Sequence, residues 1–222
     1  MQFIYSSDGE VGVGALATSL SALLNAHKRV LWLICGGSNI ALAKEVMDIV
    51  QKEAQGTIGG LTIGQTDERY GPVGHPDSNW RQMLDAHFNF EGVEALPILQ
   101  NKSLEDTAAA YSVVLADAFG SHDAVVAQFG IGADGHVAGM LPHSPAVGET
   151  ALVVGYESKP FVRITMTPPA FAHINAAYTF VFGEGKKEAV AKLQTQELSL
   201  SDEPCQILKT IPESFFYSDQ IS

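Results

Sequence analysis

An aspartate and a histidine stand two residues apart in the glycine-rich segment FGIGADGHVAGMLP, which covers residues 129–142. The imidazole of His136 can exchange protons near neutral pH, because the ordinary pKa of histidine is about 6.5. Asp134 can hold that imidazole in one tautomer, or it can cap the segment that follows. The pair suits general acid–base chemistry, and the alternative is a structural or solvent-exposed histidine.

A second polar segment, TDERYGP, covers residues 66–72 and follows a strand-like run. Arg69 can grip a phosphate or a carboxylate with its planar guanidinium group. Asp67 can orient another catalytic group. The alternative interpretation is a solvated cluster of charges in a loop before the turn at residues 71–72.

The segment CGGSN, residues 35–39, joins a predicted strand to a predicted helix. Gly36 and Gly37 let backbone amides approach a ligand closely, and Ser38 adds a hydroxyl group. The start of the following helix favours an anion. A tight turn capped by Ser38 or Asn39 is the alternative.

Three further cations stand near predicted strand ends. Lys186 and Lys187 occupy a predicted helix start in GEGKKE, where a cation is unfavourable unless an anion lies nearby. Arg163 lies amid apolar neighbours in FVRITM, so we expect it either to pair with a carboxylate or to reach a ligand.

Helix-period and strand-like runs alternate along the chain and would position these loops. The alternation predicts an α/β fold, a three-layer, Rossmann-like, mainly parallel sheet with helices on both faces, and residues 1–222 as a single domain. Ligands bind beyond the carboxyl ends of strands in such sheets, where these loops would meet. Predicted helices cover residues 13–27, 39–54, 77–88, 103–119 and 186–196; predicted strands cover 29–35, 61–66, 123–132, 151–157, 161–166 and 177–183.

Composition narrows the class of function. The formal net charge of −12 and only 13 lysines and arginines argue against nucleic-acid binding, which needs clustered cations. The amino terminus lacks a basic start followed by an apolar stretch, and no run is long enough to span a membrane. We therefore expect a cytoplasmic protein. Cys35 and Cys205 have no metal-ligand spacing and are interpreted as reduced, buried thiols.

Taken together and in this order, the loops resemble the 6-phosphogluconolactonase family. The similarity lies in TDERYGPVGHPDSNWRQML, GIGADGHVAGMLPHSP, CGGSN, RITMT and FGEGKKEAV, and it extends over roughly residues 10–215. The resemblance implies a sugar-phosphate isomerase/CoA-transferase-like fold, and hydrolysis of 6-phospho-D-glucono-1,5-lactone in the oxidative pentose phosphate pathway.

The resemblance also implies roles for single residues. His136 is the expected general base, with Asp67 or Asp134 orienting it or the attacking water. The expected phosphate ligands are the amides of residues 36–38 with Arg69, Lys186 and Arg163, and Arg69 is also a candidate donor to the oxyanion. No cofactor or metal is expected. The expected partner is a small sugar-phosphate lactone, without nucleic acid or membrane, and the expected state is a monomer or weak homodimer.

Two alternatives remain open. Glucosamine-6-phosphate deaminases share the glycine loop and the Asp-Gly-His motif, but they resemble DEY and serine-tyrosine where this chain has Arg69 and Asn79. They also carry a glutamate where this chain has Leu141. A non-catalytic sugar-phosphate-binding protein is the second alternative. This chain also departs from both families at Asn39, Val137 and Gly139, and Gln128 interrupts an apolar strand.

Overall fold

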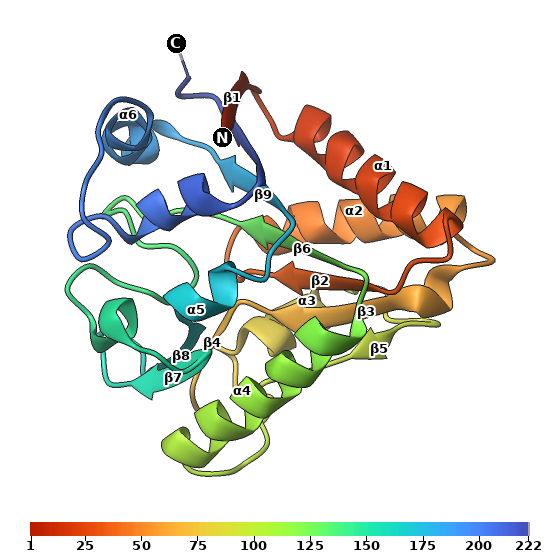
Figure 1. The fold of residues 1–222 in the computed structure, drawn as a ribbon, viewed down its shortest axis with the longest axis horizontal. Helices are drawn as coiled ribbons and strands as arrows, with labels where there is room; N and C mark the ends of the chain where they lie inside the picture. The colour runs from red at the N-terminus through yellow and green to blue at the C-terminus, as the bar shows by residue number, and fades with distance from the viewer. Residues whose placement is uncertain (222) are drawn as a thin grey trace.

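The computed structural model describes residues 1–221 and contains two sheets (Figure 1). The larger sheet has seven strands in the order β1-β10-β9-β6-β2-β3-β5 within the described residues, and its neighbouring strands pair in parallel. Its strands are β1 (Gln2–Tyr5), β2 (Val30–Ile34), β3 (Leu61–Gln65), β5 (Glu94–Ala95), β6 (Ala124–Phe129), β9 (Ala176–Val181) and β10 (Glu213–Ser218). The prediction of a mainly parallel α/β sheet is confirmed.

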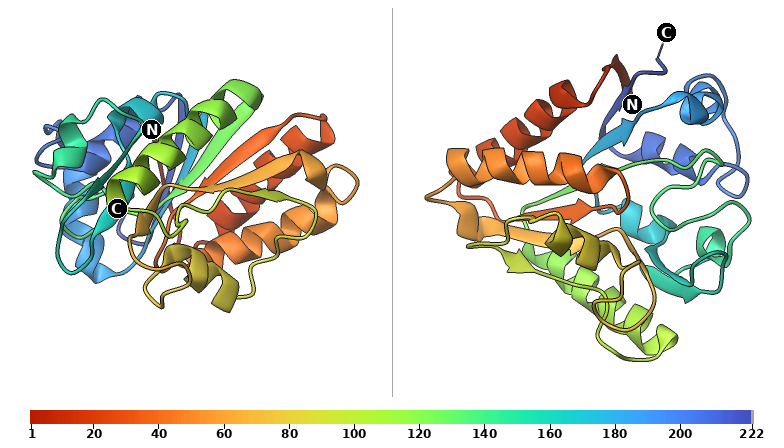
Figure 2. Two further views of the ribbon diagram at one scale, coloured as in Figure 1. Left: turned by 90° about the horizontal axis from the view of Figure 1, so that it is seen from below. Right: turned by 180° about the vertical axis from the view of Figure 1, so that it is seen from behind.

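Helices cover both faces of this sheet, and Figure 2 shows α1 and α2 on one side and α4 on the other. They are α1 (Glu10–Asn25), α2 (Asn39–Glu53), α3 (Asn79–Asp85), α4 (Leu104–Ser121), the single turn α5 (Pro168–Phe171) and α6 (Lys187–Thr195). Short 3-10 helices cover Ile58–Gly60, Pro145–Gly148, Glu184–Lys186 and Pro204–Thr210.

The two faces of the buried strand β2 pack in two different hydrophobic cores. Trp32 packs in the core beneath α1 and α2, whereas Leu31 and Leu33 pack in the core beneath α4. Successive side chains of a strand point to opposite faces, so a central strand covered on both sides is apolar along its whole length. Among the described residues, no helix combines the length and apolar composition needed to cross a bilayer.

The smaller sheet corrects the sequence-based interpretation. The runs at residues 151–157 and 161–166 form strands, as expected, but they join β4 in a separate antiparallel sheet of order β4-β8-β7. Its strands are β4 (Asp67–Arg69), β7 (Val153–Tyr156) and β8 (Arg163–Met166). The segment read as the loop TDERYGP thus contains a strand, β4, which only Thr66 separates from the end of β3.

Candidate active site

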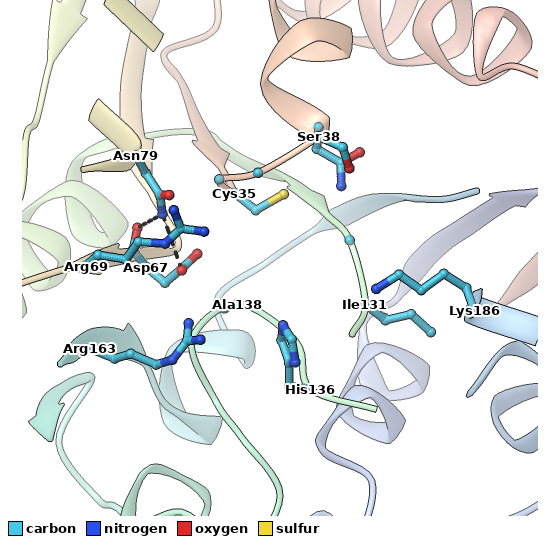
Figure 3. Close-up of a pocket in the computed structure, with 14 residues that line it drawn as sticks. Cys35, Ser38, Asp67, Arg69, Asn79, Ile131, His136, Ala138, Arg163 and Lys186 are labelled. Carbon is cyan, nitrogen blue, oxygen red and sulfur yellow. Dashed lines mark hydrogen bonds between the residues drawn. The ribbon is translucent and has the colours of Figure 1, made fainter. Parts of the chain in front are cut away.

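The four predicted loops meet at the carboxyl edge of the larger sheet. They follow β2, β3, β6 and β9, which are neighbours in the order β9-β6-β2-β3. A cavity of about 230 Å³ opens there (Figure 3), lined by Cys35, Gly36, Gly37, Ser38, Asn39, Asp67, Arg69, Asn79, Gly130, Ile131, His136, Ala138, Arg163 and Lys186. The chain reverses its direction across the sheet between β2 and β6, where α/β sheets open a ligand crevice.

The glycine loop after β2 presents an open helix start to the cavity. Ser38 stands at the N-cap position of α2, but within the described residues its side chain makes no capping hydrogen bond. Gly37 adopts a φ of 74°, and a Cβ atom on Gly36 would lie 2.0 Å from the Oδ1 atom of Asn79. The glycines are therefore required by the backbone turn and by close packing. The amide of Ile40 donates to the backbone oxygen of Gly37 at 3.1 Å, and the positive end of the α2 dipole favours an anion at the cavity.

His136 and Asp134 form a close pair in the loop after β6. Nδ1 of His136 lies 2.6 Å from Oδ1 of Asp134. The hydrogen bond from His136 lowers the pKa of the Asp134 carboxyl to about 2. The ionised carboxylate can only accept, so Nδ1 carries a proton, and the tautomer of the neutral ring that fits this bond has its lone pair on Nε2. The ring stands at the cavity and points toward its centre in Figure 3.

A glycine makes room for this pair. A Cβ atom on Gly132 would lie 2.0 Å from Nδ1 of His136 and 2.2 Å from Oδ1 of Asp134. Asp67 does not contact the imidazole; its side chain accepts hydrogen bonds from Oγ1 of Thr66 at 2.9 Å and from Nδ2 of Asn79 at 3.3 Å. Of the two expected orienting carboxylates, the structure therefore pairs Asp134 with His136 and places Asp67 across the cavity.

Glu68 is a residue whose role the sequence did not indicate. Its side chain is fully buried and accepts five hydrogen bonds. The donors are the backbone amides of Arg69, Asn79 and Trp80, the hydroxyl of Ser78 and the side-chain amide of Gln65. This carboxylate ties β4 to the start of α3, and so it positions Asp67, Arg69 and Asn79 at the cavity.

Three cations face the cavity without a carboxylate partner. Among residues 1–221, no carboxylate oxygen lies within 4.0 Å of a side-chain nitrogen of Arg69, Arg163 or Lys186. Nε of Arg163 is buried and has no hydrogen-bond partner in the described chain. Lys187 behaves differently, because its ammonium group pairs with Glu184 at 3.0 Å. The cavity thus concentrates positive charge in an acidic protein.

Asn39 and Gln128, which both depart from the family pattern, lie together behind the glycine loop. Nε2 of Gln128 donates to the backbone oxygen of Asn39 at 3.0 Å, and Nδ2 of Asn39 donates to the backbone oxygen of Phe180 at 3.4 Å. Both side chains are buried. The polar residue within the apolar strand β6 therefore supports the start of α2.

The other departures concern packing behind the His136 loop. Val137 is fully buried in the core. The amide of Gly139 donates to Oγ1 of Thr165 at 2.9 Å, and a Cβ atom on Gly139 would lie 2.9 Å from Cβ of Thr165. Val137 therefore packs in the core, and Gly139 leaves room for Thr165 and Asp67, so both positions shape the scaffold around the cavity.

The thiol nearest to this chemistry is inert. Cys35 lines the cavity, and burial raises the pKa of its thiol well above the ordinary value. A protonated thiol is a poor nucleophile. Both cysteines are free and buried in the structure, as the sequence predicts.

The sequence of this chain is similar to that of a known enzyme family. A family described as glucosamine-6-phosphate isomerases/6-phosphogluconolactonase matches residues 11–215. The chain belongs to this family. It is 30% identical over 204 residues to the 6-phosphogluconolactonase of Mycobacterium bovis, covering 85% of this chain and 80% of that protein.

Solved structures of family members share the fold. A 6-phosphogluconolactonase from Shewanella baltica superposes with a TM-score of 0.79 at 19% identity, over 97% of each chain. A monomeric glucosamine-6-phosphate deaminase superposes with a TM-score of 0.77 at 19% identity, over 99% of this chain and 98% of that chain. Both activities therefore occur on this fold, and the choice between them depends on the side chains at the cavity.

Proposed function

We propose that this protein hydrolyses 6-phospho-D-glucono-1,5-lactone to 6-phospho-D-gluconate. The observation that carries the proposal is one cavity that combines an oriented imidazole with three cations that have no carboxylate partner among residues 1–221. The imidazole suits attack on a reactive carbonyl, and the cations suit a phosphate dianion. The family relationship and the names of the curated relatives support the same reaction.

The phosphate group binds at the glycine loop. The amides of residues 36–38 and the open start of α2 donate to its oxygens. Lys186, Arg69 and Arg163 supply the balancing charge. This end of the substrate does not react, so its binding energy positions the lactone ring over His136.

His136 acts as the general base. Its Nε2 takes a proton from a water molecule, and the oxygen of that water forms a bond to the lactone carbonyl carbon. The resulting oxyanion is stabilised by donors of the same cavity, the backbone amides of the glycine loops. Asp134 holds the imidazole in the required tautomer and stabilises the imidazolium.

The second half of the reaction returns the proton. The tetrahedral intermediate collapses, the bond from the carbonyl carbon to the ring oxygen breaks, and the imidazolium protonates that oxygen. The sugar leaves as an open-chain acid that ionises to the gluconate. Asp67 lies across the cavity from His136 and is suited to orient the water or a substrate hydroxyl group.

The test of this proposal is lactone hydrolysis by the purified protein, measured as acid release and corrected for the spontaneous rate in buffer. We expect a rate well above the spontaneous rate, with no release of ammonia from glucosamine 6-phosphate. Leu141, at the position of the deaminase glutamate, carries no carboxylate, and its amide faces the hydroxyl of Tyr156 at 3.4 Å. A rate equal to that of buffer would leave the sugar-phosphate-binding protein as the better interpretation.

Lys186 and Lys187 form a matched pair for testing the phosphate site. Lys186→Ala is expected to raise KM by about 10-fold or more, because it removes a charge-assisted contact to the phosphate. Lys187→Ala is expected to leave KM within about 2-fold, since this ammonium pairs with Glu184 away from the cavity. Steady-state kinetics on both variants measures the difference, and equal effects would place the phosphate elsewhere.

The dependence of kcat on pH at saturating substrate tests the state of Asp134, because ionisation of the free substrate phosphate does not affect it. The value of kcat is expected to fall as pH falls, because a protonated imidazole cannot accept a proton from water. Asp134 does not take up a second proton in this range, since its pKa is lowered from 3.8 to about 2 and it stays ionised above about pH 4. The logarithm of kcat should therefore decline with a slope of one on the acid side. A slope approaching two between about pH 5 and 8 would show that a second group titrates with the base.

A further inference from the structure

Two arginines lie directly opposite each other in the small antiparallel sheet. Arg69 of β4 and Arg163 of β8 are register partners in the ladder, so their side chains leave the same face. Like charges in this arrangement repel, and among the described residues no carboxylate within 4.0 Å relieves them. Both guanidinium groups nevertheless line the cavity (Figure 3).

The ring of Phe161 lies beside both guanidinium groups. The guanidinium carbon of Arg69 lies 4.5 Å from the centroid of the Phe161 ring, and that of Arg163 lies 5.9 Å from the same centroid. The face of an aromatic ring attracts a cation electrostatically within about 6 Å. Phe161 itself does not line the cavity, so its effect on a ligand must pass through the two arginines.

Hydrogen bonds to the backbone hold the segment that carries Phe161 next to β4. The backbone oxygen of Phe161 accepts a hydrogen bond from Oγ of Ser158 at 2.5 Å, and that of Val162 accepts one from the amide of Tyr70 at 2.8 Å. A carboxylate in place of the ring would also hold the arginines, but it would neutralise them. The ring holds them and keeps their full positive charge for a ligand.

We propose that Phe161 is a positioning residue that holds Arg69 and Arg163 side by side as one receptor for the phosphate dianion. This inference rests on the proposed function and deepens it, because it assigns the preference for a phosphorylated lactone to the ring–arginine cluster. Loss of the ring should weaken phosphate binding while leaving His136 and its chemistry in place.

The decisive variant replaces Phe161 with pentafluorophenylalanine, which keeps the shape of the ring and reverses its quadrupole. We expect KM for the phosphorylated lactone, and the dissociation constant for inorganic phosphate measured by calorimetry, to rise together by about 10-fold. We expect kcat to change by less than about 3-fold. Phe161→Leu should behave in the same way, and Phe161→Tyr should restore values near those of the wild type.

A mutant cycle supplies the control for a merely structural effect. In an Arg69→Gln background, the loss of the Phe161 ring should have little further effect on phosphate affinity, because its main partner is gone. Unchanged phosphate affinity in the fluorinated variant, or a fall in kcat alone, would overturn the proposal. Calorimetry with inorganic phosphate needs no turnover, so it tests Phe161 even if the lactone proves not to be the substrate.

Discussion

Replacing His136 with alanine is expected to lower kcat/KM for the phosphorylated lactone by about 10²–10⁴-fold, bringing the rate close to spontaneous hydrolysis. The variant removes the nitrogen that would accept the proton of water and return it to the ring oxygen. The phosphate ligands stay in place, so inorganic phosphate should bind with unchanged affinity. This combination separates loss of chemistry from loss of binding.

His143 supplies the matched control, since it lies in the same segment of the sequence but outside the cavity. Its ring is largely exposed and contacts Ser201 and Asp202. His143→Ala is expected to keep kcat/KM within about 2-fold of the wild type. If both histidine variants lose activity equally, or if His136→Ala retains most of it, another group supplies the base.

Replacing Glu68 with glutamine is expected to lower the free energy of unfolding by about 2–4 kcal/mol. The substitution keeps the size of the side chain but changes one acceptor oxygen into an NH₂ group. In either orientation, that group faces at least one backbone amide donor that the carboxylate now satisfies. A buried donor without an acceptor is expensive, and the charge that favours the start of α3 is lost as well.

Urea unfolding followed by circular dichroism measures this change. Glu149→Gln is a suitable control, because Glu149 also accepts two backbone amides but is only partly buried. Water can replace those bonds, so its unfolding midpoint should barely move. An equally small shift in Glu68→Gln would show that the five hydrogen bonds of Glu68 are not needed to hold β4 against α3.

Local patterns in the sequence determined the class of fold. The helices α2 and α4 begin within one residue of the starts that the apolar period predicts, and Ser103 caps α4 by accepting the amide of Asp106 at 3.1 Å. These features depend on neighbours a few residues apart, which a sequence displays directly. The edge strand β1 and its neighbour β10 escaped notice, because short runs without a clear alternation resemble coil.

The sequence also determined which polar loops meet at the cavity. Each of the four polar loops follows a strand of the parallel sheet, and the rule that ligands bind at that edge does not depend on the order of the strands. The structure places Gly36, His136 and Lys186 at one cavity. Their catalytic and binding roles, and the expectation of a single domain, stay predictions.

Only the tertiary structure decided which groups act together. It paired His136 with Asp134 rather than Asp67, turned Lys186 toward the cavity and Lys187 away, and placed β7 and β8 in a second, antiparallel sheet. It also buried Glu68, which the sequence presents as part of a solvated charge cluster. Such choices depend on contacts between residues far apart in the chain, and a local pattern of charge or hydropathy carries no record of those contacts.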